Sequence, residues 1–243
     1  MRLERTFIGV DGVGQTTEER LWTSGARTWD EFDPDLVGPT TAGRIEAFIE
    51  TARPRLERGD SGFFHQALPS DERWRLYEDF RSVACFFDIE TTGLSSDYHD
   101  VTTVSFHRGG ETTTLVSGDD LTRQNVREAL DAPLLVSFNG ARFDVPFLED
   151  AFDMNIDRPH LDLMYPCRRV GLTGGLKAIE PDVGIERDRP DISGRDAVRL
   201  WREYERGRDG ALETLISYNR EDAVNLQTVA DAVVSKLDET VLP

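Results

Sequence analysis

Hydrophobic residues in the first third of the chain recur at the spacing of helices. Over Thr41–Arg58 they fall at every third or fourth position, which places them on one face of a helix. A shorter helix is predicted over residues 16–22, and another begins after Pro69. The segment Asp60–Gly62 is expected to break this pattern. The spacing therefore predicts a helical region over residues 1–80.

The pattern changes after Ser82. Short runs of β-branched and aromatic residues now alternate with segments of helical periodicity, and Arg108–Gly110 has the composition of a hairpin turn. A hairpin followed by alternating strands and helices predicts an α/β fold with a mixed central sheet flanked by helices, in a domain spanning residues 81–243. Strands are predicted at residues 83–87, 101–106, 112–116, 133–138 and 160–164, and helices at 122–130, 145–152, 176–180, 194–206 and 212–237.

Composition narrows the class of protein. The chain has 243 residues, of which 38% are hydrophobic and 30% charged, so it can bury a core and is not collagen-like, disordered or a disulfide scaffold. Its longest apolar runs, such as Val83–Phe87, fall far short of the roughly 20 residues of a membrane helix. Residues 1–10 lack the apolar core of a signal peptide, and two cysteines fit a reducing compartment. We expect a soluble, cytoplasmic protein.

The charge is strongly acidic. There are 46 acidic and 28 basic residues, giving a net charge of −18, and only Lys177 and Lys236 are lysines. Such a chain repels nucleic acid in dilute salt, but the repulsion is screened in molar salt, where the Debye length is about 3 Å. Abundant aspartate with scarce lysine resembles proteins of salt-loving microbes, which favours a halophilic origin over ordinary solubilising charge. Charge alone does not exclude a nucleic-acid substrate.

Two carboxylates occur within a predicted buried strand. Side chains alternate along a strand, so Asp88 and Glu90 share a face with Phe86, whereas Phe87 and Ile89 point the other way. Like charges this close raise each other's pKa when buried. The alternative is that the strand ends here and both side chains reach water.

A third carboxylate interrupts the apolar face of the last predicted helix. Aspartate is almost never buried without a partner, and Tyr218 lies one turn before Asp222 on the same face. Pairing with Arg220 is a weaker explanation, because that residue lies roughly 200° around the helix. The face consists of Ala211, Leu215, Tyr218, Asp222, Leu226, Val229 and Val233.

A fourth carboxylate, Asp144, follows the turn at residues 139–143 and by itself reads as the N-cap of the next helix. If all four carboxylates converge, however, they need cations to offset their repulsion. Mg²⁺ prefers hard oxygen ligands, and two such ions about 4 Å apart can stabilise the attacking and leaving oxygens of a phosphoryl displacement. The tyrosine, with a pKa near 10, can orient the attacking water but is a poor base.

Three segments together resemble the motifs of the DEDD superfamily of exonucleases. They are Asp88-Ile89-Glu90-Thr91-Thr92-Gly93-Leu94, then Asn139-Gly140-Ala141-Arg142-Phe143-Asp144, and finally Tyr218-Asn219-Arg220-Glu221-Asp222, which has the tyrosine form, DEDDy, of the third motif. Within the superfamily, Asp162-Leu163, residues 175–180 and the opening of the chain are similar to the YprB-type, RNase H-like group. The resemblance covers nearly the whole chain and is weakest over residues 34–59.

This resemblance implies an RNase H-like fold and metal-dependent removal of nucleotides from the 3′ ends of DNA or RNA. It assigns Asp88, Glu90 and Asp222 to an ion that activates water, and Asp88 with Asp144 to a second ion, both Mg²⁺ or Mn²⁺. Tyr218 would orient the nucleophile. The expected nucleic-acid contacts are Thr91, Asn139, Phe143 and Lys177.

Several alternatives stay open. The protein could instead be an RNase H-like endonuclease on RNA–DNA hybrids, or a nucleic-acid-binding module without turnover. Phe143 could be a core residue and Lys177 a surface charge. The turn Gly12–Gly14 resembles a helix-hairpin-helix, or it joins helices that only pack on the catalytic domain. His160 and Asp162 are expected to be local hydrogen-bonding groups and not metal ligands.

Overall fold

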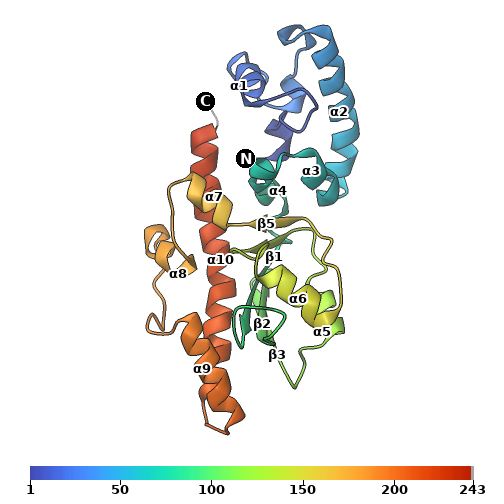
Figure 1. Ribbon diagram of the computed structural model, residues 1–243. Coiled ribbons are helices and arrows are strands. Elements are labelled where there is room, and N and C mark those ends of the chain that lie inside the picture. Colours follow the sequence, from blue (N-terminus) through green and yellow to red (C-terminus); the bar gives the residue numbers. More distant parts are fainter. Residues whose placement is uncertain (242–243) are drawn as a thin grey trace.

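A five-stranded mixed sheet forms the centre of the protein in the computed structural model, which describes residues 1–241 (Figure 1). Strands β1, β2 and β3 pair antiparallel, whereas β1, β4 and β5 pair parallel, in the order β3-β2-β1-β4-β5. The predicted α/β fold with a mixed sheet flanked by helices is thereby confirmed. The strands are β1 (Cys85–Thr91), β2 (Val101–Arg108), β3 (Glu111–Val116), β4 (Leu135–Ser137) and β5 (His160–Asp162).

The alternation of side chains along β1 builds a separate core on each face of the sheet. Phe86 packs in the core that contains Leu226, Val229 and Val233 of α10 (Ala211–Val241). Phe87 packs in a second core with side chains of α5 (Arg123–Ala129) and α6 (Asp144–Phe152). The strand extends to Thr91, beyond the predicted end at residue 87, so Asp88 and Glu90 lie within regular structure.

Helix α10 has 31 residues and runs alongside the sheet up to the helical region (Figure 1). Every residue of the apolar face predicted for it is buried. The predicted strand at 160–164 is shorter than expected, because the chain turns into α7 directly after Asp162. No helix within residues 1–241 is long and apolar enough to cross a membrane. The other elements here are α7 (Met164–Arg169), α8 (Leu176–Ile179), the 3-10 helix η5 (Pro181–Val183) and α9 (Gly194–Glu205).

The first 80 residues form short helices that pack on the upper end of α10 (Figure 1). The predicted break near Asp60–Gly62 is confirmed, because one helix ends at Glu57 and the next begins at Ser61, where the Asp60 side chain accepts a hydrogen bond from the Phe63 amide. The helix expected after Pro69 begins as a 3-10 helix. The elements are η1 (Leu3–Arg5), α1 (Gln15–Thr23), η2 (Trp29–Glu31), η3 (Pro34–Leu36), α2 (Pro39–Glu57), α3 (Ser61–Ala67), η4 (Ser70–Leu76) and α4 (Tyr77–Phe80).

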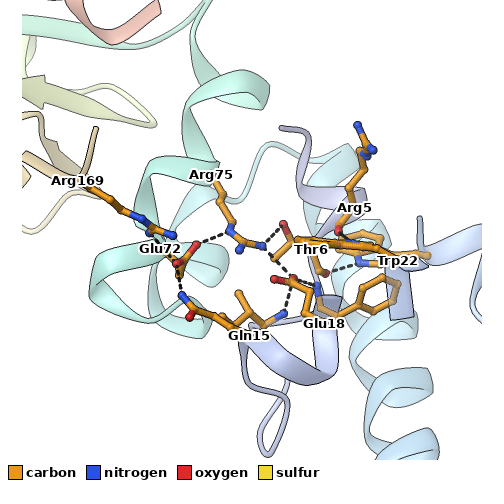
Figure 2. Close-up of polar contacts among 11 residues, drawn as sticks. Arg5, Thr6, Gln15, Glu18, Trp22, Glu72, Arg75 and Arg169 are labelled. Carbon is orange, nitrogen blue, oxygen red and sulfur yellow. Dashed lines mark hydrogen bonds and ion pairs between the residues drawn. The ribbon is translucent and has the colours of Figure 1, made fainter. Parts of the chain in front are cut away.

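A buried network of ion pairs crosses this helical region (Figure 2). Arg75, whose side chain is 1% exposed, pairs with Glu18 of α1 at 2.9 Å and with Glu72 of η4 at 2.7 Å. Glu72 also pairs with Arg169 of α7 at 2.7 Å, so the network reaches the sheet domain. Glu18 in addition accepts the backbone amide of Phe7 at 2.7 Å. In this Arg75 network, two carboxylates and two guanidinium groups neutralise one another.

Candidate functional site

Four carboxylates and a tyrosine line one cleft of about 290 Å³. Asp88 and Glu90 come from β1, Asp144 is the first residue of α6, and Tyr218 and Asp222 lie on α10. One carboxylate oxygen from each of Asp88, Glu90 and Asp222 lies within 4.8 Å of the other two. The structure therefore brings together the five side chains that the sequence singled out as catalytic.

The sheet topology explains this convergence. Strands β1 and β4 run parallel, so the chain leaves both at the same edge of the sheet, and α6 begins after the turn that follows β4. The interpretation of Asp144 as an N-cap is wrong, because Phe143 holds that position and makes no side-chain capping bond. Asp144 instead sits inside the first turn, with its carboxylate in the cleft and 4% of its surface exposed.

Burial and mutual repulsion raise the pKa of all four acids of the cleft. Removal from water is the largest cause raising the pKa of Asp88 and Glu90 well above the usual range, and the charges of Asp222 and Asp144 add to it. Burial also raises the pKa of Asp144 to about 7 and of Asp222 to about 6. The cleft thus holds more negative charge than its surroundings compensate.

Two cations lie beside this cluster. Arg187, in the loop between η5 and α9, is 5% exposed and pairs with both Asp222 and Glu180. The Nζ atom of Lys177 lies 4.7 Å from the centre of the Tyr218 ring and has no hydrogen-bond partner within residues 1–241. Sequence reasoning missed Arg187, because a loop residue 35 positions before its partner leaves no periodic signal.

Asn219 is a second residue that sequence reasoning missed. Its fully buried Nδ2 donates to the Asp88 carboxylate at 2.7 Å and to the Asp88 carbonyl at 3.1 Å, which fixes the carboxylate in place. A signal for it was present in the sequence: Asn219 lies three residues before Asp222 and therefore on the same face of α10.

The side chain of Asp162 fixes the turn between β4 and α6 through hydrogen bonds. The carboxylate of Asp162 accepts the amides of Asn139 at 2.7 Å and Ala141 at 3.2 Å, so its predicted role as a local hydrogen-bonding group is confirmed. Asn139 has a φ of 62°, in the left-handed region. A Cβ on Gly140 would lie 2.1 Å from the Ser137 Oγ, so only glycine fits at that position.

The structure places three of the four predicted nucleic-acid contacts in the cleft. Asn139, Phe143 and Lys177 line it together with the carboxylates. Phe143 also packs against the Phe147 ring, at 4.8 Å between ring centres. Thr91 does not belong to the lining, because its hydroxyl donates to the carbonyl of Gly93 instead.

The donor set of the cleft fits a hard divalent cation. Asp88, Glu90 and Asp222 offer carboxylate oxygens at chelating separation, and Asp144 adds a fourth acid. Mg²⁺ and Mn²⁺ favour such oxygen ligands, whereas zinc is bound mostly through histidine and cysteine. A bound cation would also offset the repulsion that raises the pKa of each of these acids.

Two solved structures share the fold of this chain at TM-scores of 0.50 or more, and a third is less similar. The family B DNA polymerase of Pyrobaculum calidifontis is similar with a TM-score of 0.52 and 16% identity over 62% of this chain, which spans only 24% of the polymerase. A protein described as the apo form of the nuclease gives 0.50 and 18%, over 71% of this chain and 79% of that one. NrnC of Brucella melitensis gives 0.48 and 18%, over 68% and 77%.

Comparison with known protein families identifies the family of this chain. Among curated protein sequences, none matches this chain. The family model for the RNase_H superfamily matches residues 85–234, which begin with β1 and end within α10 and so include every carboxylate of the cleft. This match covers more than half of the chain. The chain belongs to the RNase_H superfamily.

Proposed function

We propose that this protein is a metal-dependent 3′–5′ exonuclease of DNA or RNA, of the DEDDy type and closest to the YprB-type group. The observation that carries the proposal is the convergence of Asp88, Glu90, Asp144, Tyr218 and Asp222 on one cleft. Each of the three motifs contributes at least one of these side chains. The 3′–5′ direction and the subgroup rest on the motif resemblance. Residues 81–243 would form the catalytic domain.

The carboxylates would hold two divalent ions. Asp88, Glu90 and Asp222, whose oxygens lie within 4.8 Å of one another, would bind one, and Asp88 with Asp144, which lines the same cleft, the other. When bound, the ions supply Lewis acidity at the attacking water and at the leaving 3′ oxygen. Asn219 would keep the Asp88 carboxylate turned toward both positions, because it binds one oxygen of that group.

Tyr218 would act as a hydrogen-bond donor and not as a base. Burial, and then the charges of Asp222 and Glu90, raise the pKa of its hydroxyl further above the usual value of about 10. The hydroxyl therefore stays protonated at neutral pH and can orient a water. Lys177, whose ammonium group lies over the Tyr218 ring without a hydrogen-bond partner within the described residues, would bind a phosphate oxygen.

The test uses purified protein and DNA and RNA oligonucleotides labelled at the 5′ end, with Mg²⁺, Mn²⁺ or a chelator, at low and at molar salt. We expect a ladder of products shortened from the 3′ end, no products with chelator, and no products when the 3′ end is blocked. Asp144→Asn should lower the rate at least roughly 100-fold, because a group that acts in the transition state is lost.

The matched control is Asp153→Asn. Asp153 is exposed, ends the same helix α6 that begins at Asp144, and has a left-handed φ of 46° that asparagine also tolerates. This variant should digest at the wild-type rate. Wild-type activity in Asp144→Asn would contradict the proposal. Cleavage of a hybrid whose 3′ end is blocked would instead identify an endonuclease.

A further inference from the structure

A second cavity, of about 620 Å³, lies between the helical region and the β5 edge of the sheet. We call it the interdomain groove. One wall is formed by α3 and η4, with His65 and Arg73, and the other by β5 and α7, with Tyr165 and Arg169. Ala141, in the turn between β4 and α6, also lines it. None of the five side chains of the catalytic cleft belongs to this groove.

The groove gathers basic groups in a chain whose net charge is −18. Arg73 donates from Nε to the carbonyl of His65 at 3.2 Å and forms no ion pair with a carboxylate of the described residues. Within residues 1–241, the acids in the lining are the exposed Asp71 and Asp162, whose carboxylate oxygens already accept backbone amides. The lining thus holds two arginines and two aspartates, and Arg73, which has no carboxylate partner within residues 1–241, is available to contact an anion.

An exposed aromatic ring stands at the mouth of the groove. The side chain of Tyr165 is 45% exposed, and the guanidinium carbon of Arg142 lies 5.9 Å above the centre of its ring. Arg142 itself is exposed and has no carboxylate partner among residues 1–241. Aromatic rings and arginine planes are the surfaces on which unpaired bases stack.

The groove and the catalytic cleft share one turn of the chain. Asn139 and Phe143 line the cleft, whereas Ala141, between them, lines the groove. Asp162 anchors this turn through the amides of Asn139 and Ala141, so the two cavities are held in fixed relation. A strand that crosses the turn passes from the groove into the cleft.

The wall formed by α7 is fixed to η4 before any ligand binds. Arg169 is held by Glu72 at 2.7 Å and by the carbonyl of Asp71 at 3.2 Å, and Glu72 belongs to the buried Arg75 network (Figure 2). Arg169 therefore needs little further ordering when a ligand binds.

We propose that the interdomain groove binds the single-stranded part of the substrate upstream of the nucleotide being removed. One base stacks on Tyr165, and the adjoining phosphates contact Arg73 and Arg142. The inference rests on the proposed exonuclease function and adds to it a preference for unpaired strands longer than a dinucleotide, because a dinucleotide that fills the cleft cannot also reach the groove.

The test measures binding without cleavage. Fluorescence anisotropy in chelator gives the affinity of wild-type protein for labelled single-stranded oligonucleotides of two and of about eight nucleotides, over a range of salt. We expect the longer strand to bind more tightly. Tyr165→Ala should weaken its binding about 10-fold, the loss of one stacked base. The double variant Arg73→Gln/Arg142→Gln should reduce the slope of log affinity against log salt by about 1.4, since each phosphate contact on a single strand contributes about 0.7.

The control is Tyr204→Ala, which removes a tyrosine 39% exposed on α9, outside the groove. It should bind both strands as wild type does, and thermal melting of each variant checks that it is folded. Unchanged binding in the Tyr165 and arginine variants, or equal affinity of the wild type for both lengths, would overturn the proposal. The same oligonucleotides incubated with Mg²⁺ report cleavage separately, so failure of the exonuclease function and failure of the groove are told apart.

Discussion

The protein buries charge in two places, and the two clusters are built on opposite principles. In the Arg75 network, Glu18 and Glu72 face Arg75 and Arg169, and every carboxylate has a guanidinium partner (Figure 2). In the catalytic cleft, four carboxylates and the neighbouring Glu180 face two cations among the described residues, Arg187 and Lys177. Balanced buried charge fixes helices in place, whereas surplus negative charge on a rigid frame is what a divalent cation requires.

The pKa shifts of the buried acids also differ between the Arg75 network and the catalytic cleft. Burial raises the pKa of Glu72, but its two arginines more than offset this, and the net result is a lowered pKa. Burial raises the pKa of Asp144 to about 7, and hydrogen bonds from the backbone offset only part of that rise. The comparison therefore yields tests in which the two clusters respond differently.

The largest effect on the free energy of unfolding should come from a change of pH in the absence of metal. A carboxyl group with a raised pKa stabilises the folded protein below its unfolded pKa, and this contribution is lost as pH rises through the folded pKa. For Asp144 the window runs from about 4 to about 7. The free energy of unfolding of wild type should fall by roughly 4 kcal/mol relative to Asp144→Asn across this window, because each pKa unit equals about 1.4 kcal/mol. Urea unfolding in chelator measures it.

Adding Mg²⁺ at pH 8 should restore the stability of the wild type and leave Asp144→Asn less affected. Parallel pH profiles for the two proteins would contradict the view that Asp144 shares a site with uncompensated negative charge.

A smaller effect is expected from the balanced cluster. Glu72→Gln keeps the shape of the side chain but removes one of two negative charges, so Arg75 and Arg169 lose a charged partner. The variant should lose about 2–3 kcal/mol of unfolding free energy, the usual value for hydrogen bonds to charged groups. The loss should be the same with and without Mg²⁺, since the network lies outside the cleft. A metal-dependent loss would show that the two clusters are coupled.

The smallest effect on the free energy of unfolding should come from an exposed ion pair in the same helical region. Arg53 pairs with Asp30 at 2.6 Å, with side chains 36% and 79% exposed. Arg53→Gln should change the unfolding free energy by less than about 0.5 kcal/mol, and the change should shrink further in molar salt. A loss as large as that of Glu72→Gln would mean that burial is not what separates the clusters.

The sequence predicted those features that depend on local periodicity. The alternation along β1 correctly put Asp88 and Glu90 on one face, and the 3.6-residue period of α10 correctly placed Asp222 on its buried stripe. The sequence could not predict how Asp222 is compensated. Arg187 reaches it from a loop, and only the packing of α9 and η5 beside α10 decides where that loop lies. Taken alone, Asp144 was interpreted as an N-cap, because a capping carboxylate and a buried one share the same local sequence, and only the motif resemblance assigned it to the site.

The 31 residues of α10 carry catalytic side chains in their middle and anchor the helical region nearer their end, where Asp231 accepts a hydrogen bond from Tyr77 at 2.8 Å. One unbroken helix thus fixes the rotation and height of the catalytic side chains relative to the helical region. Inserting a single residue after Asp222 would turn everything beyond it by 100° and advance it by 1.5 Å. Natural variants of this fold should therefore change length in loops and leave the stretch between Asp222 and Asp231 untouched.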